Sequence, residues 1–343
     1  MEVLVTGGAG YIGAHACKRL FERGHRPLVL DNLSSGRPEF VRWGGLIRGD
    51  TRRPEDLAAC FAGRRIDAVM HFAAFIEVAE SVAAPLKYYA NNVGGTIALL
   101  EAALAHGVRL FVFSSSAAVY GDPETVPIPE GHPFRPKNPY GRTKTVVEEI
   151  LADCGRAQGL RWAALRYFNA AGADPGGEIG ERHEPESHLI PRLLEAAARG
   201  EGPVFVYGTD YPTADGTCIR DYIHVNDLAE AHILALEHLA AGGAGGAFNL
   251  GLGRGWSVRE VIDTVAGVTG KRLETRDAPR RPGDPAVLVA DCRRAMELLG
   301  WRPAVRNLEE IVATAWNWHR GRPGACAAPM ARENDAPPHL HRR

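Results

Sequence analysis

Short apolar runs alternate with amphipathic stretches along the first half of the chain. The runs predict strands at residues 3–6, 27–31, 45–48, 68–72, 110–114 and 162–166. Between them, apolar residues recur at helical spacing after Gly13 and again after Pro139. Strands alternating with helices are typical of right-handed βαβ units. We therefore expect an α/β fold built on a doubly wound parallel sheet.

The pattern becomes less regular beyond about residue 175. Loops rich in Gly and Pro are expected at 174–180 and 210–217, and a strand at 204–207. We predict that residues 1–175 form the sheet domain and that 176–320 form mainly a smaller lobe. Residues 221–239 have the pattern of a strand followed by a helix, so parts of 221–255 are expected to return to the first domain. Residues 321–343 lack periodicity and are predicted to be a disordered tail.

Composition narrows the kind of partner. The chain has 343 residues with 40 basic and 41 acidic side chains, and this net charge of -1 does not attract nucleic acid or an anionic membrane. A small-molecule partner is expected instead. Residues 2–5 have the pattern of a strand, and neither a signal-length nor a membrane-spanning apolar run is found. The six cysteines are scattered without a C-x-x-C pair, which is typical of a reducing compartment, so we expect a cytoplasmic protein.

Two histidines raise the question of a metal site. His183 and His188 are separated by several loop residues and have no cysteine nearby. Hydrogen-bonded or solvated histidines are the commoner reading of such a pair, so we predict no metal site.

A glycine-rich segment follows the first predicted strand. Gly7, Gly10 and Gly13 lie between this strand and the next helix, where they allow a tight turn, close approach of a pyrophosphate and close helix packing. The helix N-terminus adds N–H donors and a partial positive charge. This arrangement predicts a dinucleotide site.

Acidic residues follow the next two predicted strands. Asp31 lies 18 residues after Gly13, where a carboxylate accepts hydrogen bonds from ribose hydroxyls. It repels a 2′-phosphate, which favours NAD over NADP, although Arg37 nearby weakens this preference. Asp50 follows the third strand and either contacts adenine or caps a turn.

Candidate catalytic groups follow the fifth predicted strand and open the helix after Pro139. Ser114, Ser115 and Ser116 end the fifth strand, and Tyr140 and Lys144 open a helix on one face. Placing a phenol pKa near 7 requires about 4 kcal/mol of phenolate stabilisation, whereas one cation about 5 Å away supplies roughly 3 kcal/mol. Lys144 alone is therefore marginal, and the oxidised nicotinamide is expected to act as the second cation.

Together these motifs resemble the extended short-chain dehydrogenase/reductase family, and within it the UDP-glucose 4-epimerases. The resemblance covers about residues 1–320. Besides the glycine loop and Tyr140–Lys144, it rests on Asp31-Asn32-Leu33, His71-Phe72-Ala73-Ala74, Asn91-Asn92-Val93, Ser114 to Gly121, Leu165-Arg166-Tyr167-Phe168-Asn169, Arg220-Asp221-Tyr222-Ile223-His224-Val225 and Arg281-Pro282-Gly283-Asp284. It implies a Rossmann-like fold and an NAD-dependent enzyme.

The resemblance also implies roles for individual residues. Tyr140 would be the catalytic base, Ser116 would bind the sugar O4 and relay its proton, and Lys144 would bind the nicotinamide ribose and lower the Tyr140 pKa. The cofactor-binding set would be Gly7, Gly10, Tyr11, Ile12, Gly13, Asp31, Asn32, Asp50, Thr51, Phe72, Ala73, Asn92, Ser114, Tyr140, Lys144 and Phe168. The substrate-binding set would be Ser116, Tyr140, Asn169, His188, Leu189, Tyr207, Arg220, Arg281 and Asp284.

The activity implied by the resemblance is reversible C4 epimerisation of UDP-glucose and UDP-galactose through a transient 4-keto sugar. The NAD would stay tightly bound between the two half-reactions. Members of this family are commonly homodimers packed through two helices per subunit, and the apolar stripe of the helix after Tyr140 suits such an interface.

Several departures leave the substrate open. Leu288 matches a position that a bulky Tyr fills in glucose-restricted members, so UDP-N-acetylhexosamines are a candidate substrate, as are UDP-pentoses such as xylose and arabinose derivatives. Ile76 and Glu77 also depart from some members. A 4,6-dehydratase is disfavoured because Ala117 and Ala118 stand where such enzymes carry Asp-Glu. A non-catalytic NAD-sensing module is the alternative from another class.

Overall fold

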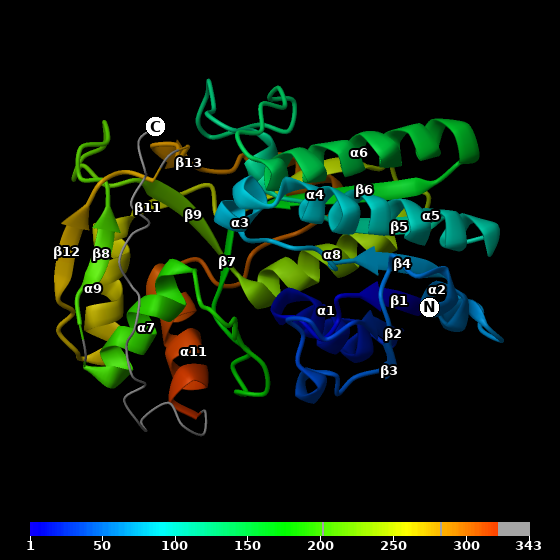
Figure 1. Ribbon diagram of the computed structural model, residues 1–343, viewed down its shortest axis with the longest axis horizontal. Coiled ribbons are helices and arrows are strands. Elements are labelled where there is room, and N and C mark those ends of the chain that lie inside the picture. The colour runs from blue at the N-terminus through cyan, green and yellow to red at the C-terminus, as the bar shows by residue number, and fades with distance from the viewer. Residues whose placement is uncertain (201, 282, 322–343) are drawn as a thin grey trace.

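A seven-stranded parallel sheet forms the centre of the larger lobe (Figure 1). The computed structural model describes residues 1–200, 202–281 and 283–321. The sheet contains β1 (Glu2–Thr6), β2 (Arg26–Asp31), β3 (Gly45–Arg48), β4 (Ala68–His71), β5 (Leu110–Ser114), β6 (Arg161–Tyr167) and β10 (Gly246–Leu250) in the order β10-β6-β5-β4-β1-β2-β3. The strand order reverses between β1 and β4, and ligands of such sheets bind in the crevice beyond the carboxyl ends at this point.

Helices cover both faces of this sheet because alternate strand residues point to opposite sides. Val3 and Val5 of β1 pack into one core with α1 (Tyr11–Glu22) and α8 (Val225–Ala240). Leu4, between them, packs into a second core, which contains residues of α2 (Pro54–Phe61), α5 (Gly95–Ala105) and α6 (Pro139–Gln158). The chain is therefore doubly wound, which confirms the predicted fold class.

Short helical segments connect the strands of this lobe. They are η1 (Pro38–Phe40), α3 (Val78–Ala83), α4 (Pro85–Tyr88), the π-helical η2 (Tyr89–Gly94) and η3 (Ala117–Val119). Four of them, α3, α4, η2 and η3, contact α6, and α3 and α4 lie on the upper side of the lobe in Figure 1.

The smaller lobe lies beside the carboxyl ends of the sheet strands (Figure 1). It contains β7 (Asn169–Ala171), β8 (Val204–Tyr207), β9 (Ile219–His224), β11 (Gly255–Ser257), β12 (Thr275–Ala278) and β13 (Val287–Leu288), with α7 (Leu189–Arg199), α9 (Val258–Thr269) and α11 (Leu308–Gly321). These three helices share a core that includes Leu193, Val261 and Ile311. The short α10 (Arg293–Leu298) contacts β10 instead.

The chain returns to the larger lobe after β9. The six strands expected in the first half of the sequence are present within one residue of their predicted ends. The strand at 219–224 belongs to the smaller lobe, where it pairs with β7, β11 and β13, whereas α8 and β10 join the large sheet. The boundary at residue 175 stays a prediction. From residue 322 on, the predicted tail lies outside the described residues.

Membrane-spanning helices and the state of the cysteines both bear on where in the cell the protein is expected. Within residues 1–200, 202–281 and 283–321, no helix has both the length and the apolar character that crossing a membrane requires. The five cysteines of these residues, Cys17, Cys60, Cys154, Cys218 and Cys292, are free thiols.

Candidate active site

The turn between β1 and α1 requires glycine at two points. Gly7 has φ +74°, and a Cβ there would lie 2.6 Å from the backbone nitrogen of Ala73. A Cβ on Gly13 would lie 2.3 Å from the carbonyl oxygen of Gly7. Because glycines form most of this turn, its backbone packs closely and the first residues of α1, Tyr11, Ile12 and Gly13, line the crevice with their N–H groups at a helix start. Such a cradle fits the pyrophosphate of a dinucleotide.

Asp31 ends β2 and braces this turn. Its Oδ2 accepts a hydrogen bond of 3.0 Å from the Ala9 N–H, and its Oδ1 accepts one of 2.8 Å from the Leu33 N–H. Burial raises the pKa of Asp31, while these two N–H groups act in the opposite direction. The carboxylate therefore lies at the strand end where a ribose is bound in dinucleotide folds.

Asp50 contacts Asn32, the residue that follows Asp31 in the sequence. Its carboxylate accepts hydrogen bonds from Asn32 Nδ2 at 3.1 Å and from Arg52 Nη2 at 2.7 Å. The Arg52 hydrogen bond is the largest cause that holds the Asp50 pKa well below its usual range. Asp50 Oδ1 also orients the start of the following loop, since it accepts the Arg52 N–H at 2.9 Å. The turn-capping alternative for Asp50 is therefore realised, and Asp50 also lines the cavity described below.

Three serines at the end of β5 have different partners. Ser114 Oγ lies 2.7 Å from Tyr167 Oη, and Ser115 Oγ donates to Glu148 Oε1 at 2.5 Å. Ser116 Oγ caps η3 by accepting the Ala118 N–H at 3.2 Å. Of the three, Ser116 is the one whose hydrogen bonding acts to lower the pKa of Tyr140. The serine and the phenol line the same cavity.

Tyr140 and Lys144 lie on the first turns of α6. This helix begins at Pro139, and Asn138 caps it by accepting the Gly141 N–H at 2.9 Å. Lys144 Nζ donates to the Ser114 carbonyl oxygen at 2.8 Å and lies 5.8 Å from the centre of the Tyr140 ring. The strand end and the helix start therefore hold the phenol, the ammonium group and the serines together, as the sequence predicts.

Burial dominates the ionisation of both groups. It raises the pKa of Tyr140, whereas the hydrogen bond from Ser116 acts to lower it. Burial also lowers the pKa of Lys144 to about 7, although the nearby Glu148 carboxylate opposes this. Lys144 is therefore only partly charged at neutral pH in the protein alone. This agrees with the expectation that a single cation is not enough to ionise the phenol.

Tyr140, Ser116, Asp31 and the glycine turn line a cavity of about 540 Å³ between the two lobes, a size typical of small-molecule sites. Most of the expected cofactor residues line it: Gly7, Gly10, Tyr11, Ile12, Gly13, Asp31, Asn32, Asp50, Thr51, Phe72, Ala73, Ser114, Tyr140 and Phe168. Five of the expected substrate residues beyond Ser116 and Tyr140 also line it: Asn169, His188, Leu189, Arg220 and Asp284.

Four expected site residues do not line this cavity. Lys144 is 3% exposed and lies behind Tyr140. Asn92 Nδ2 donates to the Phe75 carbonyl oxygen at 3.0 Å and to Thr143 Oγ1 at 3.1 Å, so its side chain joins η2 to α6. The Arg281 guanidinium lies 4.2 Å from the ring centre of Tyr207. The roles of these four residues stay predictions.

The cavity wall contains residues that sequence reasoning did not assign. Tyr167, Phe75 and Ile76 belong to it, as do Glu181 and His183. The sequence argument against a metal site rested on the separation of His183 from His188, but the loop brings their ring centres to 5.1 Å. The available signal was a Glu-x-His segment that occurs twice, at 181–183 and 186–188.

A parallel doubly wound sheet with a glycine turn, a strand-end carboxylate and a Tyr and a Ser that line one cavity defines a dinucleotide-dependent enzyme of Rossmann-like fold. The family model described as "NAD dependent epimerase/dehydratase family" matches residues 3–251. The chain belongs to this family. The predicted family resemblance, the enzyme class and the NAD cofactor are thereby confirmed.

Individual relatives agree with this assignment. The chain is 51% identical over 323 residues to the UDP-glucose 4-epimerase of Halalkalibacterium halodurans, covering 94% of this chain and 97% of the relative. The crystal structure of UDP-glucose 4-epimerase from Brucella ovis in complex with NAD matches with a TM-score of 0.89 and 50% identity, over 92% of this chain and 97% of that one. The UDP-Glc/GlcNAc 4-epimerase from Campylobacter jejuni matches with a TM-score of 0.81 and 41% identity, over 93% and 99%.

Proposed function

We propose that the protein interconverts UDP-glucose and UDP-galactose by epimerisation at C4. The observation that carries this proposal is that Tyr140 and Ser116 face the same cavity as Asp31 and the glycine turn. A proton-transferring hydroxyl pair is thereby placed next to a dinucleotide site. The relatives described as UDP-glucose 4-epimerases support the same reaction.

The residues present fit the NAD cofactor. The glycine turn at Gly7 and Gly13 would accommodate the pyrophosphate, and Asp31 would accept hydrogen bonds from the ribose. When bound, NAD supplies a reversible hydride acceptor for C4 of the sugar. A carboxylate at position 31 disfavours a 2′-phosphate, which agrees with NAD rather than NADP.

The protein's own groups carry the proton. Ser116 bonds to the sugar O4 and to Tyr140, and Tyr140 takes the O4 proton as C4 is oxidised to a ketone. The same phenol returns this proton after the sugar has turned its other face. Lys144 orients Ser114 at the strand end and stabilises the phenolate from behind. Arg220, which lies 3.5 Å from Asp284, is placed to bind the nucleotide half of the substrate.

An assay of the purified enzyme tests this function. Incubation with UDP-glucose and, separately, with UDP-galactose should reach one and the same mixture without added NAD. If neither sugar is converted although the protein binds NAD, the proposal fails and a dinucleotide-sensing role is favoured.

We extend the proposal to UDP-N-acetylhexosamines because of Leu288. This side chain lines the cavity and packs beside the cluster of Val119, Tyr120 and Ile128. The Leu288→Tyr variant should lower kcat/KM for UDP-N-acetylglucosamine by about 10–100-fold, since the larger ring fills the volume that an N-acetyl group needs. Conversion of UDP-glucose is the internal control and should change little. No turnover of UDP-N-acetylglucosamine by the unmodified enzyme would refute this extension.

We further propose that the protein is a cytoplasmic homodimer. In α6, Val147 and Leu151 pack into the core, so the stripe expected to form the interface is largely used within the subunit. The exposed Leu86 and Ile97, in α4 and α5, offer an apolar surface near α6 instead. Sedimentation should give a dimer mass that the Leu86→Glu variant lowers to a monomer mass, whereas Phe21→Glu on α1 should not. A monomeric unmodified protein would contradict the proposal.

A further inference from the structure

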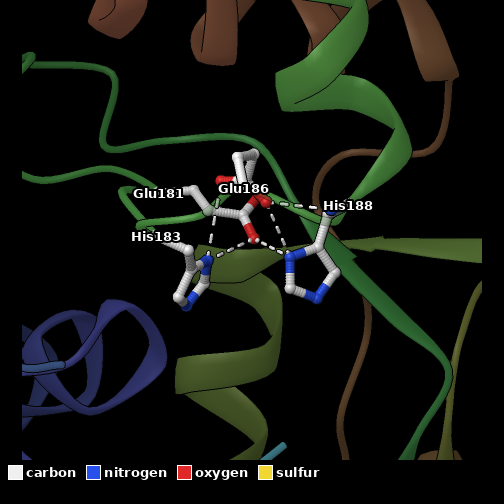
Figure 2. Close-up of side chains that lie close together, drawn as sticks. All are labelled: Glu181, His183, Glu186 and His188. Carbon is white, nitrogen blue, oxygen red and sulfur yellow. Dashed lines mark hydrogen bonds and ion pairs between the residues drawn. The ribbon is translucent and has the colours of Figure 1, made fainter. Parts of the chain in front are cut away.

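Two glutamates and two histidines meet in the loop between β7 and α7. Figure 2 shows Glu181, His183, Glu186 and His188 with their carboxylate and ring atoms turned toward one another. His188 Nδ1 lies 3.0 Å from an oxygen of each glutamate. His183 Nδ1 lies 3.4 Å from Glu181 and 3.6 Å from Glu186. We refer to these four residues as the Glu–His quartet.

The spacing of the quartet matches a tetrahedral metal shell. Zinc binds imidazole nitrogen and carboxylate oxygen at about 2.0–2.2 Å, so neighbouring ligand atoms of a tetrahedral site lie roughly 3.2–3.6 Å apart. The four glutamate–histidine contacts measure 3.0 to 3.6 Å and involve both oxygens of Glu186, and with one ligand atom from each residue the four atoms lie within 4.8 Å of one another. One ion at the centre would therefore reach all four side chains once the widest pair moves closer to the tetrahedral spacing.

Hydrogen bonding within the quartet leaves one nitrogen unexplained. The buried His183 Nδ1 lies 3.4 Å from a Glu181 oxygen and 3.6 Å from a Glu186 oxygen, and neither contact has good hydrogen-bond geometry. Because a buried nitrogen held only by such long contacts is costly, an ion that draws the four side chains together is favoured.

The surrounding chain orients the glutamates. Glu186 Oε1 accepts the N–H groups of Ser187 and His188, each at 2.9 Å. The carbonyl oxygen of Glu181 accepts the Trp318 Nε1–H at 3.2 Å, which fixes the backbone of that residue to α11. Partners of this kind hold metal ligands in place in known sites. The side chains of Glu181 and Glu186 are only 9% and 6% exposed.

We propose that the Glu–His quartet binds one divalent transition-metal ion of the zinc class. The two carboxylates balance the charge of the ion, and the two neutral imidazoles complete the shell. Four protein ligands leave no open position, so the site is structural rather than catalytic.

The loop that carries the quartet contacts the larger lobe and lines the cavity, so an ion bound there would affect the site. Glu184 pairs with Arg37 of the larger lobe at 2.9 Å, and Ser187 Oγ bonds to Glu77 Oε1 at 3.0 Å. Glu181, His183 and His188 also line the cavity. By crosslinking the loop at four points, the ion would hold this side of the cavity closed and slow the release of NAD.

Zinc titration of the full-length enzyme tests the proposal. After treatment with a chelator, calorimetry should show one tight Zn²⁺ site per chain. In the His183→Asn/Glu186→Gln double variant, affinity at this site should fall by at least about 100-fold, since two of four ligands are lost. His106→Asn, which removes an exposed histidine at the end of α5, is the matched control and should bind as the unmodified enzyme does. The control also guards against weak surface binding, since the chain contains 13 histidines.

Two further measurements keep the test independent of folding defects in the variant. The unmodified enzyme loaded with Co²⁺ should show the intense visible absorption of a tetrahedral ion, and NAD should dissociate more slowly with Zn²⁺ than without it. An octahedral Co²⁺ spectrum, equal zinc affinity in the double variant, or binding only at millimolar zinc would overturn the proposal. In the last case the quartet would be an ion-pair network alone.

Discussion

Replacing Tyr140 with Phe is expected to lower the rate of C4 epimerisation by about 10²–10⁴-fold. This change removes only the ionisable hydroxyl group. The aromatic ring still fills the same space, so the NAD content should be unchanged. The measurement is kcat for UDP-galactose, together with the amount of NAD released from the denatured enzyme. Full activity at normal NAD content would disprove the role of Tyr140.

Tyr120→Phe is the matched control for this experiment. Tyr120 is also buried, but its hydroxyl donates to Asn249 Oδ1 at 2.6 Å and accepts from Arg166 Nη1 at 2.9 Å, and Tyr120 does not line the cavity. Loss of this hydroxyl should lower stability but not the rate per folded molecule. A similar loss of kcat in both variants would point to a general packing defect.

The pH dependence of the unmodified enzyme follows from the same phenol. Burial raises the Tyr140 pKa, so the neutral form is favoured and the rate should rise with pH as the base loses its proton. A cationic nicotinamide about 5 Å away contributes roughly 3 kcal/mol, or about 2 pKa units, in the opposite direction. In kcat profiles, where the cofactor is bound, the rise should therefore occur at a lower pH than burial alone would give. It should be absent from the Tyr140→Phe variant.

Local sequence patterns were sufficient to predict most of the larger lobe. Each strand is short, apolar and bounded by turns, and the catalytic helix begins at a proline preceded by a capping asparagine. The glycine turn, Asp31 and Tyr140 could be placed because they follow these elements directly. Their meeting in one cavity follows from the parallel sheet, whose strands all end at the same edge.

Features that depend on distant pairings could not be predicted in the same way. Strand β10 joins the large sheet beside β6, although its Leu250 pairs with Tyr167, which lies 83 positions earlier in the chain. The strand at 219–224 joins the smaller lobe because its partners are β7, β11 and β13. The Glu–His quartet depends on how one loop folds back on itself, and no periodicity encodes that path.

A buried ion pair behind the catalytic helix is the clearest example of such a distant contact. Glu148 lies one turn after Lys144 on α6, and Arg166 lies on β6. Arg166 Nη2 donates to Glu148 Oε2 at 2.6 Å, and the side chains are 5% and 3% exposed. The Glu148 carboxylate also raises the pKa of the Arg166 guanidinium.

Arg166→Met is expected to destabilise the protein by about 3–5 kcal/mol, because it leaves the Glu148 carboxylate buried without its partner. For a chain of this size the thermal midpoint should fall by about 4–8 °C. Arg156→Met is the matched control: this residue forms an ion pair with Asp153 on the same helix, but the side chains are 73% and 70% exposed. Its removal should not shift the midpoint measurably.

The direction in which stability changes with pH distinguishes an unpaired buried carboxylate from a simple loss of packing. In Arg166→Met, burial should raise the folded-state pKa of Glu148 above its unfolded value, so the folded state binds more protons and the variant's stability should increase as pH falls. The Glu148→Leu/Arg166→Met double variant carries neither buried charge and should recover part of the lost stability. Equal unfolding midpoints for Arg166→Met and Arg156→Met, or a double variant as unstable as the sum of its single changes, would contradict the interpretation. Because Ser115 donates to Glu148 and precedes Ser116, kcat of Arg166→Met should also fall, whereas that of the exposed control should not.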